Sequence, residues 1–321
     1  MIKITSLISV LCLFVCLLPS CGYSENNKIF EIKKIFEWDT SAGFVFYYFQ
    51  GNATYAFLQT GGYYVVLRYD DKKMNIIKTN SKEYSRFDVV GSILDDFIDE
   101  GQQIGIYGSE NIIKIQDNLS VNLNARASGK KVIEIMENEN KYEIKDCFYI
   151  DGLSDIVFVD HMNLKVYFRA EVKGETGIAV VDIKQKIANL IIKEEDNRRH
   201  FGDQYSSPVR IPNTEFLLFY QTRMYESFTN IFIMEIPEWK AEIEQQKANV
   251  KLYPQAKKYF INGPANIRNT PKGKIFATID HHTEVLVLNN DGDWYEVLYA
   301  NIRGWTYKDN LRLNEVTENE D

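Results

Sequence analysis

The chain has 321 residues, 45% of them hydrophobic and 26% charged, and its formal net charge is -8. A chain of this length and apolar content buries a sizeable core, which excludes the disordered, low-complexity and collagen-like classes. The excess of acidic residues and the lack of a Lys/Arg block argue against a nucleic-acid partner, because nucleic-acid-binding proteins neutralise phosphates with a basic surface.

The N-terminus has the features of a targeting segment. Lys3 is the only charged side chain before a 12-residue apolar run from Leu7 to Leu18. This length is typical of the hydrophobic part of a signal peptide and is too short for an ordinary membrane-spanning helix of about 20 residues. No second stretch of 18 or more apolar residues follows. We therefore expect the rest of the chain to lie in solvent outside the cytoplasm.

The apolar run ends in Leu18-Pro19-Ser20-Cys21, and three of the four cysteines lie within the first 21 residues. This segment resembles the signal peptide of bacterial lipoproteins, with a Leu three residues before the Cys and a small residue just before it. The resemblance implies that residues 1–20 are removed, that Cys21 is lipidated, and that residues 21–28 tether the protein to a membrane. It also implies a location in the bacterial cell envelope, in the outer membrane or periplasm or at the cell surface. Two or more acyl chains anchor a protein stably.

Cys147 stands apart from the other cysteines, in a segment with the pattern of a strand. We interpret it as a small buried hydrophobic residue rather than a reactive nucleophile, since nothing around it lowers the pKa of a thiol.

Residues 29–237 have the pattern of antiparallel hairpins, in which short β-branched or aromatic runs alternate with polar turns. Clear turns fall at residues 70–73, 116–118, 137–140 and 184–186. Residues 87–97 carry the best helical pattern of the domain. The pattern predicts an all-β fold, either a propeller-like array of about four or five blades or a β-sandwich, both of which protect strand edges.

Residues 238–258 follow Pro237 and contain good helix formers, with Trp239 and Ile243 four positions apart on one face. We interpret this segment as a linker helix between two domains that fold separately.

Residues 259–313 contain strands and turn residues at short intervals. Asn266-Ile267-Arg268 is followed by a turn, a strand, Trp294-Tyr295-Glu296-Val297 and finally Gly304-Trp305. This order resembles that of bacterial SH3 domains along the whole domain, and the resemblance implies a small SH3-like β-barrel that binds a ligand. Residues 314–321 then form an acidic tail.

Two features of this C-terminal domain have a local physical reason. Asn290-Asp291-Gly292 supplies residues that tolerate positive φ between two strands. Gly304 lets its strand pass close to packed side chains before Trp305.

Alternation along residues 294–299 places Trp294 and Tyr299 on opposite faces of a strand. We expect Trp294 and Trp305 to pack inside, which leaves Tyr299 on the outer face. Aromatic rings and guanidinium groups there would hold a peptide and its carboxylates. The candidate binding residues, with the loop at 280–282, are Arg268, Tyr299, Arg303 and Tyr307. The resemblance implies a stem peptide of the peptidoglycan wall, or an envelope protein, as the ligand.

The catalytic inventory is small, and we expect neither an enzyme nor a cofactor nor a metal site. Asp160 and His161 are adjacent in a strand and point to opposite faces, so we interpret them as structural or surface residues. His281 and His282 follow Asp280 in a loop that we expect to be exposed to solvent, and His200 lies in a mixed-charge loop. The alternative is a cell-wall hydrolase, because two carboxylates distant in sequence can meet as an acid–base pair.

Overall fold

The computed structural model describes these parts of the chain: 32–38, 44–50, 53–60, 63–70, 72–80, 112–116, 118–127, 130–150, 157–194, 204–206, 208–223 and 228–313. The signal peptide, Cys21, the tether, the helix at 87–97, His200 and the acidic tail, all predicted from sequence, lie outside them. Within these parts, no helix is both long and apolar enough to cross a membrane.

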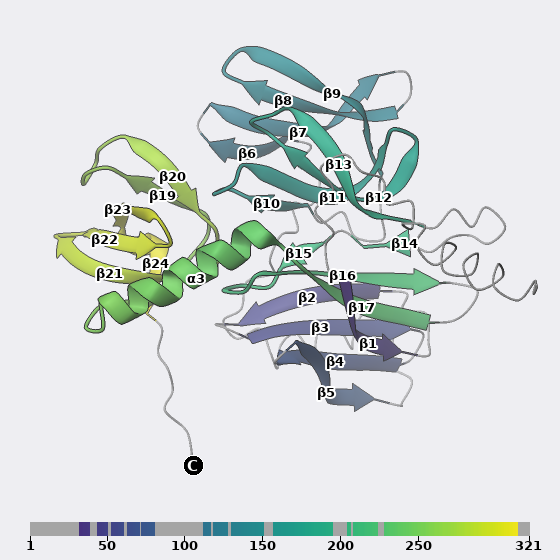
Figure 1. The fold of residues 1–321 in the computed structure, drawn as a ribbon, viewed down its shortest axis with the longest axis horizontal. Helices are drawn as coiled ribbons and strands as arrows, with labels where there is room; N and C mark the ends of the chain where they lie inside the picture. The colour runs from purple at the N-terminus through teal and green to yellow at the C-terminus, as the bar shows by residue number, and fades with distance from the viewer. Residues whose placement is uncertain are drawn as a thin grey trace, which may run out of the picture. The chain divides into compact units, whose positions relative to one another are not determined.

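The described chain is mainly β-structure, which confirms the predicted all-β class. Its sheets are antiparallel, and α3 (Pro237–Leu252) is the one α-helix among the described residues (Figure 1). The predicted hairpins are confirmed at all four turns, where alternating apolar residues on each side bury one face of the pair.

The first unit is a four-stranded meander hydrogen-bonded in chain order, made of β2 (Phe44–Gln50), β3 (Ala53–Thr60), β4 (Tyr63–Asp70) and β5 (Lys73–Asn80). Its apolar face, which includes Leu58 and Leu67, shares one core with Leu218 and Ile231 of a later sheet.

The second and third units together form an eight-stranded sheet. The second unit contains β6 (Ile112–Gln116), β7 (Leu119–Ala127), β8 (Lys130–Glu137) and β9 (Asn140–Tyr149). The third contains β10 (Phe158–Asp160), β11 (Lys165–Val172), β12 (Glu175–Asp182) and β13 (Ile187–Lys193). A short ladder between β9 and β11 joins them. Both units contribute to one core, for example through Ile133, Ile144 and Phe168.

The last unit of the N-terminal region is a five-stranded sheet. It contains β14 (Gln204–Tyr205), β15 (Val209–Arg210), β16 (Phe216–Arg223), β17 (Phe228–Glu235) and β1 (Ile32–Trp38). The strand β1 pairs with β17, so the first described strand completes the last unit. Successive small antiparallel units follow from the hairpin pattern, while the β9–β11 ladder merges two of them into one sheet.

The C-terminal region is a seven-stranded sheet in the order β20-β19-β23-β22-β21-β18-β24. The strands are β18 (Lys257–Ile261), β19 (Ala265–Arg268), β20 (Ile275–Ile279), β21 (Glu284–Asp291), β22 (Trp294–Tyr299), β23 (Ile302–Tyr307) and β24 (Leu311–Leu313), with the 3-10 turn η1 (Lys308–Asn310) before β24. No ladder between described residues joins β20 to β24, so the predicted barrel is not closed by hydrogen bonds. The sheet surrounds a core that includes Ile267, Val285 and Val297.

The two glycines singled out from sequence behave as predicted. Gly292 has φ of 57° in the turn between β21 and β22. A Cβ on Gly304 would lie 2.7 Å from the Arg268 carbonyl oxygen and 2.7 Å from Ile267 Cγ2. The close approach of β23 to β19 therefore requires glycine at this position.

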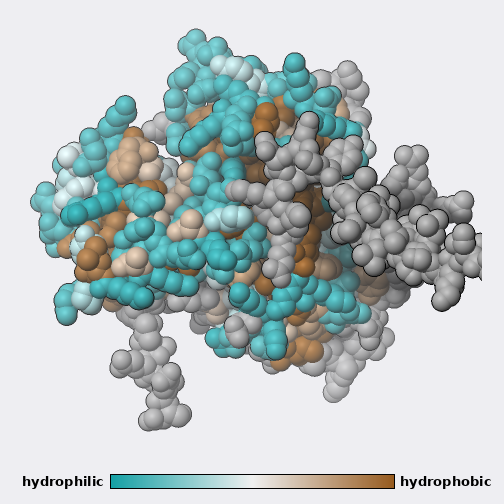
Figure 2. All heavy atoms as spheres, in the orientation of Figure 1, coloured by the Kyte–Doolittle hydropathy of each residue, from teal (hydrophilic) through white to brown (hydrophobic). Residues whose placement is uncertain are grey.

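The helix α3 begins where the sequence predicts it but ends at Leu252, and the last two residues of the predicted segment 238–258 belong to β18. It also does more than connect the two regions. Trp239 is fully buried, and Ile243, Gln246 and Asn249 on the same side are buried too. The opposite side of α3 carries mainly hydrophilic residues (Figure 2). Separate folding of the two regions remains a prediction.

Candidate functional site

Aromatic and cationic side chains lie together on one face of β22 and β23. Residues directly opposite each other in an antiparallel ladder share a face. The register pairs Trp294 with Tyr307 and Glu296 with Trp305, while Arg268 of β19 also lies opposite Trp305. These side chains, with Arg303, make up the surface that we call the aromatic strip.

The side chains of the aromatic strip support one another. The rings of Trp294 and Tyr307 meet edge to face with centroids 5.5 Å apart, a favourable arrangement for aromatic pairs. The Arg268 guanidinium lies 5.8 Å from the Trp294 ring centroid and donates a hydrogen bond of 2.6 Å to the Gly273 carbonyl oxygen. Arg303 is exposed and pairs with Glu296 at 2.8 Å.

The structure brings together three of the four predicted binding residues, Arg268, Arg303 and Tyr307, but corrects the placement of the fourth. Tyr299 is 1% exposed and belongs to the core of the C-terminal sheet. Trp294 and Trp305, predicted to be core residues, are instead only half-buried on the outer face. The alternation was right, but the inward face is the one that carries Tyr295, Val297 and Tyr299.

The inward face of β22 packs into the core of the C-terminal sheet. Tyr299 packs there with Val285 and Val297, and burial raises the pKa of Tyr299 to about 12 although the positive charge of Arg210 opposes the shift. A strand pattern cannot show which of the two faces is buried, because both faces alternate with the same period.

A cavity of about 370 Å³ adjoins the aromatic strip at Arg268. Its other lining residues are Gln116, Asn118, Lys274, Ile275 and Phe276. Phe276 is 51% exposed, so the strip continues into a recess with both apolar and cationic walls.

A second cluster of polar side chains is buried where the N-terminal sheets meet the C-terminal sheet. His161, in the turn after β10, lies with Nδ1 2.5 Å from Asp280 Oδ1, after β20. Asp160 accepts hydrogen bonds from Trp239 Nε1 at 2.7 Å and from the Asn163 side chain at 2.8 Å. We call this cluster the joining network.

Arg210 extends the joining network to α3. Its Nη1 lies 3.2 Å from Glu242 Oε2, and its guanidinium lies 4.6 Å from the Trp239 ring centroid. Glu242 also accepts a hydrogen bond of 2.7 Å from Asn163. Burial raises the pKa of both Asp160 and Glu242, with Arg210 opposing the shift.

Two amides of α3 hold the turn between β22 and β23. Gln246 Oε1 accepts a hydrogen bond of 3.0 Å from the Ala300 N–H, and Asn249 Nδ2 donates one of 2.8 Å to the Ala300 carbonyl oxygen. Ala300 has φ of 46°, an uncommon value for a residue other than glycine. The helix thus orders a strained turn of the C-terminal sheet.

The loop at 280–282 is more enclosed than the sequence predicts. His282 is buried and His281 is half-buried, and their rings stack with centroids 3.9 Å apart. Burial lowers the pKa of His282 to about 3 and that of His281 to about 4. The predicted solvent-exposed loop is therefore wrong, because Asn213 donates a hydrogen bond to the His282 carbonyl oxygen and encloses it.

The joining network brings together three carboxylates that are far apart in the sequence, those of Asp160, Glu242 and Asp280. Each forms a hydrogen bond or an ion pair within the network, and each is shielded from solvent. Asp160 is 0% exposed. Buried ion-pair networks shift pKa values as active sites do. The raised pKa values of Asp160 and Glu242 are therefore explained by burial in the joining network. Among the described residues, no three His, Cys, Asp or Glu side chains form a group able to hold a metal ion.

Cys147 is fully buried, as predicted, and burial raises the pKa of its thiol to about 12. The thiol is therefore protonated near neutral pH and packs as a small apolar side chain.

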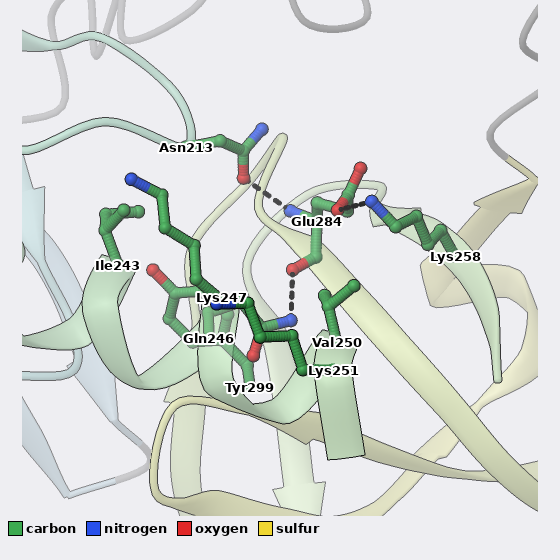
Figure 3. A pocket seen from close by; sticks show the side chains of 9 residues that line it. All are labelled: Asn213, Ile243, Gln246, Lys247, Val250, Lys251, Lys258, Glu284 and Tyr299. Carbon is green, nitrogen blue, oxygen red and sulfur yellow. Dashed lines mark hydrogen bonds and ion pairs between the residues drawn. The ribbon is translucent and has the colours of Figure 1, made fainter. Parts of the chain in front are cut away.

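A pocket of about 400 Å³ lies between α3 and β21 (Figure 3). Tyr299, Ile243 and Val250 supply its apolar surface. Its polar lining residues are Asn213, Gln246, Lys247, Lys251, Lys258 and Glu284.

Sequence reasoning missed Arg210, Glu242, Gln246 and Asn249. One signal was available on the helix, because Trp239, Ile243, Gln246 and Asn249 recur at helical spacing and so mark one buried side. No comparable local signal marks Arg210, whose partners lie in distant segments. A comparison with protein-family models, curated proteins and solved structures finds no match for this chain.

Proposed function

We propose that the protein is a bacterial cell-envelope lipoprotein, anchored by acylated Cys21, that binds a peptidoglycan stem peptide without chemically changing it. The resemblance of residues 1–21 to a lipoprotein signal supports the anchor. The resemblance of residues 259–313 to bacterial SH3 domains supports the ligand.

The observation that carries the binding role is the aromatic strip on the outer face of the C-terminal sheet. Trp294 and Trp305 are held half-buried, so each presents part of a flat ring at the surface without losing its packing. Rings held in this way contact a ligand at a low cost in conformational entropy. Arg268 beside them offers a guanidinium group for a peptide carboxylate.

A segment of an envelope protein is the alternative ligand, because it offers the same backbone and carboxylate groups. A cell-wall hydrolase is less well supported, since Asp160, Glu242 and Asp280 are committed to the joining network rather than lining the aromatic strip.

Binding is tested with a lipid-free chain of residues 22–321 and soluble muropeptides. Trp294→Ala and Arg268→Gln are expected to weaken binding about tenfold each, as for a central interface residue. Tyr142→Ala, which removes a half-buried ring from β9, is the control and is expected to leave affinity unchanged. Binding of a tryptic envelope-protein digest with no muropeptide binding would favour the alternative ligand.

Anchoring is tested by metabolic labelling with a palmitate analogue. The wild-type protein is expected to incorporate the label and to fractionate with membranes, whereas Cys21→Ser is expected to do neither. An unlabelled wild-type protein in the soluble fraction would contradict the anchor and leave the binding role intact.

A further inference from the structure

The pocket between α3 and β21 is cationic in a protein whose formal charge is -8. Three lysines line it against one carboxylate, Glu284. Lys258 lies 2.9 Å from that carboxylate and is neutralised by it. Lys247 and Lys251 form no ion pair with any residue in the described parts of the chain, and both are exposed.

Lys247 and Lys251 are four residues apart on α3, so they are neighbours on one side of the helix. Like charges at this spacing repel one another. Figure 3 shows both side chains beside the pocket, with Lys258 on its other side. An anion bound between the two lysines would remove their repulsion.

The remaining polar groups of the pocket are occupied in holding its shape. Gln246 Nε2 donates a hydrogen bond of 3.3 Å to the Glu284 carbonyl oxygen, and Asn213 Oδ1 accepts one of 2.7 Å from the Glu284 N–H. A pocket fixed in advance binds a ligand with a smaller loss of conformational entropy. The surface left for a ligand is therefore two ammonium groups beside an apolar floor, to which half-buried Val250 contributes more than the buried Ile243 and Tyr299.

We propose that this pocket binds an acidic peptide segment of a partner protein, with carboxylates on Lys247 and Lys251 and one apolar side chain on the floor. The volume of about 400 Å³ suits such a side chain with its flanking groups. Charge complementarity selects the ligand class, because the two unpaired ammonium groups beside the pocket attract carboxylates. Trp294 and Tyr299 lie on opposite faces of β22, so this site is independent of the aromatic strip.

The test measures fluorescence anisotropy of a labelled Gly-Glu-Leu-Glu-Glu-Gly peptide against the lipid-free chain of residues 22–321. The double variant Lys247→Glu, Lys251→Glu is expected to bind about tenfold more weakly, because attraction becomes repulsion at both carboxylates. Lys145→Glu with Lys184→Glu makes the same change of net charge at exposed positions of the N-terminal region and is expected to bind like the wild type. A peptide with Lys in place of Glu is expected not to bind, and one with Ser in place of Leu is expected to bind more weakly.

Equal losses in the two double variants would show a general charge effect and overturn the site. Wild-type affinity in the Lys247→Glu, Lys251→Glu variant would overturn it too. A chain that ends at Leu313 tests whether the occupant of the pocket is a partner protein or the protein's own acidic residues 314–321. Equal affinity of this shortened chain supports a partner segment, whereas tenfold tighter binding would make residues 314–321 the occupant and overturn the partner. The Lys247→Glu, Lys251→Glu variant is expected to bind muropeptides as tightly as the wild type does, which would show that the pocket and the aromatic strip are independent sites.

Discussion

His161 and Asp280 are 119 residues apart in the sequence and form a buried ion pair, with 2.5 Å between His161 Nδ1 and Asp280 Oδ1. One residue follows β10 in the N-terminal region and the other follows β20 in the C-terminal sheet. Burial lowers the pKa of His161, but the charge of Asp280 and its hydrogen bond outweigh burial and raise that pKa overall. The pair therefore ties the two regions together and depends on the protonation of one imidazole.

Removing the carboxylate tests the strength of this tie. Asp280→Ala is expected to lower the free energy of unfolding by about 2 to 3 kcal/mol, somewhat less than for a permanently charged pair because His161 can release its proton. Urea unfolding measures the change. Asp291→Ala removes an exposed carboxylate from β21 and is expected to change stability by less than about 0.5 kcal/mol. Equal effects of the two substitutions would contradict a stabilising pair.

Stability should fall as pH rises above about 6.5 because of His161. A folded pKa above the unfolded value of about 6.5 means that the stabilisation is complete below pH ~6.5 and is lost as pH rises through the folded pKa. Urea unfolding of the wild type is expected to show this loss. The free energy of unfolding of His161→Gln is expected to be lower than that of the wild type below pH ~6.5 and to change less with pH above it. Parallel pH curves for the two proteins would exclude His161 as the titrating group.

Acid should weaken the fold through the stacked histidines. The pKa of His282 is lowered to about 3, so its stabilisation is present above the unfolded pKa of about 6.5 and is lost as pH falls towards the folded value. The slope for one such group is at most about 1.4 kcal/mol per pH unit. His282→Asn is expected to reduce that slope, since Asn tolerates the φ of 58° at this position. An unchanged slope would assign the acid sensitivity to other groups.

The amides of α3 should stabilise the turn at Ala300. Gln246→Ala leaves the buried Ala300 N–H without its acceptor, so we expect a loss of about 1 to 3 kcal/mol in the free energy of unfolding. Asn249→Ala is expected to act in the same direction through the Ala300 carbonyl group. The control is Glu244→Ala on the exposed side of the same helix, where stability should stay within about 0.5 kcal/mol. Chemical denaturation of all three variants makes the comparison.

Gly304 should tolerate no side chain. Gly304→Ala places a Cβ against the Arg268 carbonyl oxygen and is expected to destabilise the protein by about 1 to 3 kcal/mol, as overpacking does. Gly292 has a positive φ but open space around it, so Gly292→Asn is expected to be nearly neutral. Thermal unfolding distinguishes the two, and an unaffected Gly304→Ala variant would contradict the close approach of β23 to β19.

Local features of the fold could be predicted from the sequence because they depend on neighbours in the chain. The turns at 137–140 and 184–186 and the helix after Pro237 all formed where alternation and turn chemistry placed them. Arg303 and Tyr307 share a face of β23 for the same reason, since strand alternation fixes which side chains of one strand lie together, whereas Arg268 joins them only through the pairing of β19 with β23.

Which of the two faces of β22 is buried was decided only by tertiary structure. Tyr299 turns inward and packs with Val285 and Val297 in the core of the C-terminal sheet, so Trp294 and Trp305 are left on the outside. Asp160, His161 and Asp280 likewise meet because β10, α3 and β20 come together, although each appeared structural or exposed in isolation. The amino-acid sequence by itself determined the strands, the turns and the grouping of residues on each face. Which face is buried, and which distant charges are paired, depended on free energy gained only when separate sheets pack together.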